Sequence, residues 1–283
     1  MLPLIKLMIF FNYQFTANRF LVVGGSLESS SGPSTEVIDV SNNSLTCNSF
    51  GELETGRSHS VGGLLENTPI VCGGTSTSIM QSCLIFGQSQ TVTMTSKRYG
   101  AASVVLNTTT MWVMGGRDNS PGYPYLSSTE LISLEKAVPG PSLKYGYTYN
   151  KNAAFCSVKY NETHVYEIGG YYGHSSSTRV YRSNTVIYNP LDNFSSKPGP
   201  EMNYRRKYPG CAIMNDGESS VIVVAGGYGC QSSSSSHCSS IDYHDSVEIL
   251  DPSLGQWTMG KKSHFKSKYL GPMLLAIAQR KFV

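Results

Sequence analysis

Short apolar stretches that end in a pair of glycines recur along the chain. The pairs are Gly24-Gly25, Gly73-Gly74, Gly115-Gly116, Gly169-Gly170 and Gly226-Gly227. The residues before each pair are mostly β-branched, aromatic or otherwise apolar, which predicts short buried strands. Glycine reaches positive φ and lets another backbone come close, so each pair predicts a sharp exit where sheets crowd together.

The intervals between successive pairs indicate a repeat architecture. Counted from the first glycine of each pair, they are 49, 42, 54 and 57 residues, the length of one small antiparallel sheet. A basic residue followed by ring or small residues announces a strand upstream of most pairs, at 57–60, 98–101, 144–146, 207–210 and 262–264. Third strands follow each pair at 35–40, 82–86, 129–133, 184–190 and 245–252. A fourth strand is plainest at residues 256–259, so we expect four-stranded blades.

These segments together resemble the kelch repeat. The resemblance rests on the basic and aromatic start, the apolar run to Gly-Gly, the strand Val247-Glu248-Ile249-Leu250-Asp251-Pro252 and a strand with Trp257. It covers the chain from about Arg19 to the end, and it implies an all-β, kelch-type β-propeller of four-stranded antiparallel blades. Only the fifth repeat keeps the Trp strand well, and the first lacks a convincing opening strand.

The number of blades has two interpretations. Five glycine pairs are followed by a partial repeat that ends with residues 274–283. Either there are five blades, with C-terminal strands completing the first, or the chain is a truncated six-bladed propeller. We favour six blades because that number is the commoner one in kelch proteins.

Composition and charge fit one domain over residues 18–283. The 283 residues are 40% hydrophobic and 14% charged, and one propeller needs a chain of about this length. The net charge of +3 is small, and no basic run is interleaved with aromatic residues. We therefore expect no nucleic-acid partner.

Residues 1–17 have two interpretations. The apolar run at 2–11 is interrupted by Lys6, and Phe15 occupies a position where cleavage after Ala17 would favour a small residue. The segment is either a signal peptide of a secreted, extracellular protein or the opening strand of the first blade in a cytoplasmic one. We favour secretion, and the run is too short and broken to predict a membrane span. Glycosylation sequons begin at Asn42, Asn107, Asn161 and Asn193.

The seven cysteines leave at least one unpaired if disulfides form. The expected disulfides are Cys230 with Cys238, in one loop, and Cys72 with Cys83, across neighbouring strands. Cys156 and Cys211 lie in predicted opening strands and are expected to be unpaired core thiols. His237 and His244 near the loop cysteines raise the alternative of a zinc site, but their spacing matches no compact zinc finger, so we expect no metal.

The loops after the glycine pairs are where a propeller carries function. By resemblance to kelch propellers that capture peptide segments, the residues that line the ligand face are Arg117, Asn119, Tyr171, Tyr172 and Tyr228, with His59 as a weaker member. Arginine offers a planar fork for a carboxylate, and tyrosine offers flat apolar area with a hydroxyl. This face would favour an acidic or polar loop. The alternative is that these are ordinary solvated loop residues.

We expect a non-catalytic module that binds a protein or peptide, or a glycan, without a cofactor. The six histidines are dispersed, and the chain has no Gly-x-Ser-x-Gly elbow, phosphate loop or His-Glu-x-x-His helix. One alternative is a substrate-recognition fragment of a ubiquitin-ligase adaptor, which would need a helical domain upstream. Another is a relative of the copper-radical, galactose-oxidase-like enzymes, whose blades are kelch-like but which also need copper ligands and a further domain.

Overall fold

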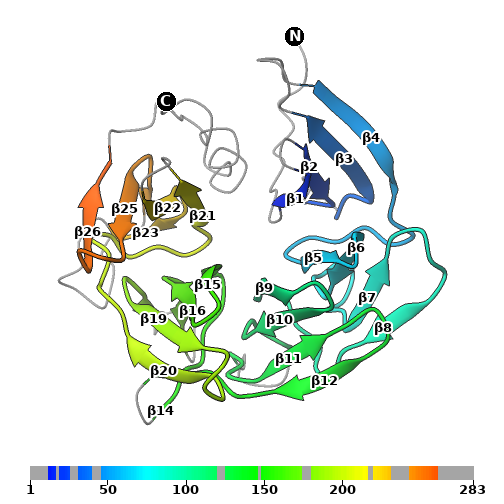
Figure 1. The fold of residues 1–283 in the computed structure, drawn as a ribbon. Coiled ribbons are helices and arrows are strands. Elements are labelled where there is room, and N and C mark those ends of the chain that lie inside the picture. Colours follow the sequence, from blue (N-terminus) through cyan, green and yellow to red (C-terminus); the bar gives the residue numbers. More distant parts are fainter. Residues whose placement is uncertain are drawn as a thin grey trace.

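Each glycine pair follows the second strand of a four-stranded antiparallel sheet. In the computed structural model these sheets are five blades arranged around a common centre (Figure 1). The structure describes residues 12–16, 19–25, 31–39, 46–119, 125–145, 148–173, 180–215, 219–230 and 242–260. The predicted partial sixth repeat, at 261–283, lies outside these residues, and six blades are not confirmed.

The blades follow one another along the chain. Blade 1 contains β1 (Asn12–Thr16), β2 (Arg19–Val23), β3 (Ser34–Asp39) and β4 (Thr46–Glu52). Blade 2 contains β5 (Val61–Leu65), β6 (Thr68–Cys72), β7 (Ser82–Ile85) and β8 (Thr91–Thr93). Blade 3 contains β9 (Ala102–Asn107), β10 (Thr110–Met114), β11 (Thr129–Ile132) and β12 (Ala137–Gly140).

The last two blades carry short additional strand pairs. Blade 4 contains β15 (Cys156–Asn161), β16 (His164–Ile168), β19 (Thr185–Asn189) and β20 (Ser195–Pro198). Blade 5 contains β21 (Gly210–Asn215), β22 (Ser220–Ala225), β25 (Val247–Asp251) and β26 (Gln256–Met259). The short pairs are β13 (Lys144–Tyr145) with β14 (Thr148–Tyr149), β17 (Tyr171–Tyr172) with β18 (Val180–Tyr181), and β23 (Tyr228–Gly229) with β24 (Asp242–Tyr243).

The hydrophobic core lies largely between neighbouring blades. Apolar side chains of blades 2 and 3 form one cluster, those of blades 3 and 4 a second, and those of blades 4 and 5 a third. Trp112 of β10 is fully buried and lies edge-on to Tyr188 of β19. Trp257 of β26 is buried, and its Nε1 donates to the carbonyl of Pro200, 3.0 Å away. The inner strands β1, β5, β9, β15 and β21 contact one another in that order.

The glycine pairs connect each blade to the next. The second glycine donates its N–H to the carbonyl of a residue just before the next inner strand: Gly25 to Arg57, Gly74 to Arg98, Gly116 to Asn152 and Gly170 to Arg206. At Gly24, which has φ of 63°, an added Cβ would lie 2.2 Å from the Arg57 carbonyl oxygen. A side chain there would push the two blades apart.

Two predicted opening segments are corrected by these hydrogen bonds. Residues 144–146 do not open blade 4: Lys144 belongs to the short strand β13, and Asn152 occupies the position of the basic residue. In blade 5 that position belongs to Arg206 and not to Lys207. The sequence prediction took a basic residue as the mark of each opening strand. In the structure, the equivalent residue of each of blades 2 to 5 is the one whose carbonyl accepts the N–H of the preceding glycine pair.

The disulfides also differ from expectation. The predicted pair Cys72 and Cys83 forms a disulfide within blade 2. The expectation of free thiols at Cys156 and Cys211 is wrong, because they form a disulfide between β15 and β21. These inner strands of adjacent blades face each other, and a Cα–Cα distance of 6.0 Å suits a disulfide. Cys230 is also disulfide-bonded, while Cys238 lies outside the described residues.

At the N-terminus, residues 12–16 form β1, which pairs with β2. The rest of the predicted signal segment, residues 1–11 and 17, lies outside the described residues. Within the part of the chain that the structure covers, no helix is long and apolar enough to cross a membrane.

Candidate functional site

A buried arginine stands at the entry to three of the blades. In blade 3, Arg98 donates to the carbonyls of Gly115 (2.7 Å) and Ser128 (3.1 Å) and pairs with Glu130 at 2.8 Å. Both charged side chains are fully buried. Burial lowers the pKa of Arg98, and the hydrogen bond to Glu130 opposes that shift. Blade 5 repeats the arrangement with Arg206, which pairs with Glu248 at 3.0 Å.

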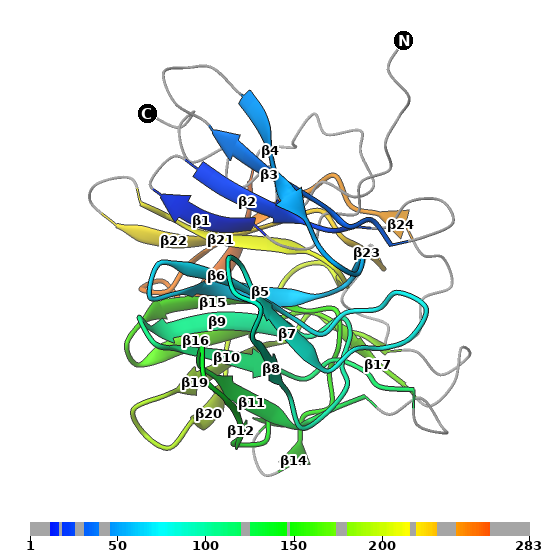
Figure 2. The same ribbon diagram turned by 90° about the vertical axis from the view of Figure 1, so that its right-hand side faces the viewer.

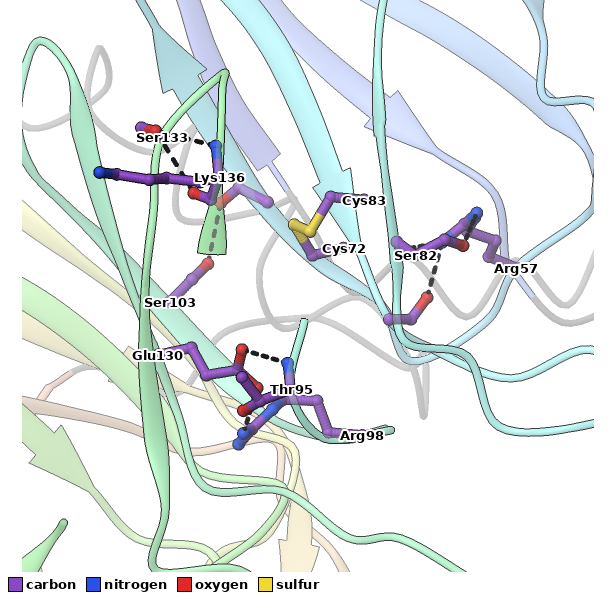
Figure 3. Close-up of a disulfide and its surroundings, with 12 residues drawn as sticks. Arg57, Cys72, Ser82, Cys83, Thr95, Arg98, Ser103, Glu130, Ser133 and Lys136 are labelled. Atoms are coloured by element: carbon purple, nitrogen blue, oxygen red, sulfur yellow. Dashed lines mark hydrogen bonds and ion pairs between the residues drawn. A yellow bond between two sulfur atoms is a disulfide. The ribbon is translucent and has the colours of Figure 1, made fainter. Parts of the chain in front are cut away.

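Blades 2 and 4 each keep only part of this network. Arg57 of blade 2 donates to the Gly73 and Ser82 carbonyls, and Figure 3 shows it beside Ser82. Leu84 occupies the position that corresponds to Glu130 of blade 3. Burial therefore lowers the Arg57 pKa to about 10. Blade 4 has a buried acid instead: Glu167 accepts hydrogen bonds from the side chains of Asn150 (2.7 Å), Asn152 (2.6 Å) and Tyr188 (2.7 Å).

Above the glycine pair, blades 2 to 5 each continue as a short ladder of three residues. In blade 3, Arg117 forms antiparallel bridges with Tyr99 and Tyr125. The equivalent residues are Ser58, Thr75 and Ile79 in blade 2, Ala153, Tyr171 and Tyr181 in blade 4, and Lys207, Tyr228 and Tyr243 in blade 5. We call the surface formed by these ladders the mouth. It lies on the right-hand side of Figure 2, where β17, β23 and β24 project.

The mouth is supported by an arc of backbone hydrogen bonds. His59, Gly100, Ala154 and Tyr208 occupy equivalent positions before four inner strands, with φ of 57°, 60°, 54° and 52°. Each of the last three donates its N–H to the carbonyl of the one before it, at 3.0, 2.7 and 2.6 Å. We call these residues the inner arc. Positive φ is uncommon outside glycine, so these bonds hold a conformation that the three non-glycine residues disfavour.

Arg117 lies among the tyrosines of the mouth. Its guanidinium carbon is 5.4 Å from the ring centre of Tyr99 and 5.0 Å from that of Tyr125. Its Nη1 donates to the Tyr171 hydroxyl at 2.8 Å. Cation–π attraction and a hydrogen bond therefore hold the side chain in one place. Arg117 is half-buried, so part of it faces solvent.

Lys207 also contacts Tyr171, at its ring. Its Nζ is 4.4 Å from the Tyr171 ring centre and 4.3 Å from that of Tyr228, with the Tyr181 and Tyr208 rings within 5.6 Å. The lysine is 5% exposed, so its charge makes the surface above it more positive, but its side chain offers little area for contact with a ligand. Tyr171 is thus shared by two cations, Arg117 at its hydroxyl and Lys207 at its ring.

His59 remains neutral at ordinary pH. Its ring lies 5.4 Å from the Tyr208 ring and 6.1 Å from the Tyr99 ring. Burial, with a contribution from the positive charge of Lys207, lowers the His59 pKa to about 4. The Tyr208 pKa is raised well above its usual value, first by burial, so this hydroxyl is also neutral.

The structure brings most of the nominated residues to the mouth. Arg117, Tyr171 and Tyr228 belong to its ladders, and His59 belongs to the inner arc. Tyr171 is only 3% exposed, so it positions Arg117 and does not offer a large contact surface. The exposed Tyr172 stacks with Arg182, whose guanidinium carbon is 4.5 Å from the ring centre. Asn119 is exposed, two residues beyond Arg117.

Lys207, Tyr99 and Tyr125 were missed as site residues by sequence reasoning. Lys207 and Tyr99 follow the buried basic residue directly, so their spacing to the opening strand could have nominated them. Tyr125 lies in a long loop and carries no such signal, because its place depends on its bridge to Arg117. Among the residues that the structure describes, no cluster of His, Cys, Asp or Glu could hold a metal ion.

Comparison with known proteins supports the fold alone. No protein-family model matches the sequence, and no curated protein matches it. A solved structure described as "Structure of YjhT" aligns with a TM-score of 0.74 and 11% sequence identity, over 94% of this chain and 87% of that one. Because 230 chains of solved structures match, the fold is shared too widely to specify a function.

Proposed function

We propose that this protein is a non-catalytic binding module that captures an acidic peptide segment of another protein at the part of the mouth formed by the ladders of blades 3 to 5. The observation that carries the proposal is that two cations contact Tyr171: Arg117 donates to its hydroxyl, and the Lys207 ammonium lies 4.4 Å from its ring centre. Two cations within one group of tyrosine rings create a positive field at a surface that also offers flat apolar area. An aspartate or glutamate side chain on an extended peptide complements both features.

The immobility of Arg117 favours selective binding. Its guanidinium is already held by the Tyr171 hydroxyl and by neighbouring rings, so little side-chain entropy is lost when a ligand arrives. The surrounding rings also lower the local dielectric, which strengthens an ion pair formed there. Aromatic residues and arginine are the side chains that most often dominate binding energy at protein interfaces.

We also propose that the blades are of the kelch type. Support comes from recurrence inside the structure: a buried arginine before the inner strand in blades 2, 3 and 5, a glycine pair after the second strand, and a buried glutamate on the third strand of blades 3 and 5. In a propeller of this kind the blades are scaffold, and the loops that meet at the mouth carry recognition.

The disulfides favour an oxidising compartment, and we propose that the protein is secreted. Cys72–Cys83 lies within a blade, and Cys156–Cys211 joins two blades. Such bonds persist outside the cell or in the secretory pathway and are rare in the cytosol. This placement also disfavours an intracellular ligase adaptor.

The test of the proposed function is selection from a random-peptide display library on the immobilised protein. We expect the selected peptides to be enriched in Asp and Glu compared with the input library. A parallel selection on the Arg117→Ala variant should lose this enrichment, and one on the matched control Thr75→Ala, the equivalent position of blade 2, should keep it. Selection of peptides without acidic residues, or equal enrichment on Arg117→Ala, would refute the proposal.

A further inference from the structure

Three glycosylation sequons lie on the side of the propeller opposite the mouth. Second strands end at the mouth, so the turns that join the first to the second strand and the third to the fourth strand lie at the other end of each blade. Asn107 is the last residue of β9, Asn161 is the last residue of β15, and Asn193 lies in the turn between β19 and β20. We call this side the turn face.

The three asparagines are accessible. Each is exposed, and Asn107 and Asn161 occupy equivalent positions in neighbouring blades. In both, the threonine hydroxyl two residues later lies 3.0 Å from the asparagine Oδ1, so the two sequons share one local geometry. Asn193 has φ of 46°, a conformation of a tight turn. Surface turns of this kind are where N-linked glycans are found.

From this placement we propose that the turn face carries N-linked glycans at Asn107, Asn161 and Asn193, while the mouth carries none. The disulfide between Cys156 and Cys211 supports this independently, because the compartment in which disulfides form is also the one in which N-linked glycans are attached. The inference goes beyond the proposed binding function and does not depend on it.

The chemistry is a group transfer without oxidation or reduction. The asparagine Nδ2 attacks the anomeric carbon of a lipid-pyrophosphate-linked oligosaccharide. A C–N bond forms, the C–O bond to pyrophosphate breaks, and the leaving group departs with the electron pair. The amide nitrogen loses one proton. The cell supplies the activated oligosaccharide, and this chain supplies the acceptor.

Segregation of glycans from the mouth would keep the ligand surface open. Asn119 is exposed next to the mouth, but it is followed by Ser120 and Pro121 and is not a sequon. Changing Pro121 to serine would turn it into one. The chain therefore offers a direct way to place a glycan on the wrong face.

The experiment is expression of the full chain from Met1 in cultured eukaryotic cells, followed by gel analysis with and without peptide N-glycosidase. An Asn42→Gln background removes the sequon outside the described residues. In this background, Asn107→Gln, Asn161→Gln and Asn193→Gln should each lower the apparent mass of the untreated protein on the gel by the mass of one glycan. The matched control is Asn215→Gln, which changes the equivalent end residue of β21 without touching a sequon and should leave the apparent mass unchanged. A band that the glycosidase does not shift would overturn the proposal.

A second measurement tests the segregation. Pro121→Ser should add one glycosidase-sensitive step and abolish capture of the selected acidic peptides. The triple turn-face variant should bind these peptides like the wild type. Weakened or strengthened binding by the triple variant, with folding unchanged by circular dichroism, would overturn the claim that the glycans stay clear of the mouth. Failure of the wild type to bind acidic peptides would refute the proposed function and leave the glycan result standing.

Discussion

Blades 2 and 3 share one backbone plan and differ in almost every functional side chain. Both receive a hydrogen bond from the preceding glycine pair, and both continue above their own pair as a bridged ladder. The ladder of blade 2 contains Ser58 and Thr75, whereas that of blade 3 contains Tyr99 and Arg117. The repeat therefore fixes where the ladder stands, and the residues placed on it decide whether the blade can bind a ligand.

The two blades also differ in what stabilises them beneath the mouth. Blade 3 pairs Arg98 with Glu130, while Arg57 of blade 2 lies opposite Leu84. Blade 2 instead has a disulfide between Cys72 and Cys83, the positions that Met114 and Thr129 occupy in blade 3. One blade is thus held by a buried ion pair and the other by a covalent bond.

The largest expected effect comes from breaking the ion pair of blade 3. Glu130→Ala leaves Arg98 buried without its carboxylate, and such losses cost about 3–5 kcal/mol of unfolding free energy. Glu130 also accepts N–H groups from Thr95 and Ser96, which would lose their acceptor. Denaturant unfolding measures the effect. The control Glu135→Ala removes an exposed acid of the same blade, and an equal loss in both variants would contradict the account.

The disulfide of blade 2 should come next. Replacing Cys72 and Cys83 by alanine removes a cross-link between residues 11 apart in sequence, which the chain-entropy relation values at about 3 kcal/mol. Under reducing conditions the wild type should fall to or below the stability of the oxidised double variant, because the Cys156–Cys211 disulfide is reduced as well. The comparison would fail if the double variant unfolded at the wild-type denaturant concentration under oxidising conditions.

A smaller effect is expected on binding when Arg117 is removed. A hydrogen bond to a charged group contributes about 1.5–3 kcal/mol. Arg117→Ala should therefore raise the dissociation constant of a selected acidic peptide by about tenfold to a hundredfold. Thr75→Ala, the same position of blade 2, should leave the dissociation constant unchanged. Titration calorimetry compares the three proteins. Equal effects of the two substitutions on the dissociation constant would contradict the claim that blade 3 binds the peptide and blade 2 does not.

The smallest effect concerns pH and the inner arc, where His59 of blade 2 corresponds to Gly100 of blade 3. The folded pKa of His59 is lowered from 6.5 to about 4, so the unfolded chain binds its proton first. Stability is therefore full above about pH 6.5 and is lost as the pH falls toward 4. His59→Gly, which copies blade 3, should flatten this decline in thermal unfolding curves. His244, whose pKa burial lowers similarly to about 4, and His164, whose pKa burial also lowers, contribute to the slope that remains. An unchanged pH profile would show that the pKa of His59 is the same in the folded and the unfolded chain.

The sequence was most informative where one residue type is physically required. Glycine pairs mark the end of the second strand, because a Cβ at Gly24 would collide with the Arg57 carbonyl. The same logic failed in blade 4, where Asn152 replaces the buried arginine and hydrogen-bonds to a buried acid, Glu167. The opening strand of blade 4 was therefore predicted at Lys144, which belongs to the short strand β13 instead.

Contacts between blades were the part that sequence could not give. Cys156 and Cys211 are 55 residues apart, and their pairing depends on how two separate sheets meet. The environment of Arg117 has the same origin, since Tyr99, Tyr125 and Tyr171 come from different segments of blades 3 and 4. Sequence reasoning nominated Arg117 and Tyr171 for the same face, and only the structure shows their hydrogen bond.

The central claim is that the mouth of blades 3 to 5 binds an acidic peptide. Amide hydrogen exchange, measured with and without a selected acidic peptide, tests it most directly. We predict slower exchange around Tyr99, Arg117 and Tyr228, with no change at Ser58 or in the turn that follows Asn107. Protection confined to the turn face, or spread equally over the ladders of blades 2 and 3, would contradict the account.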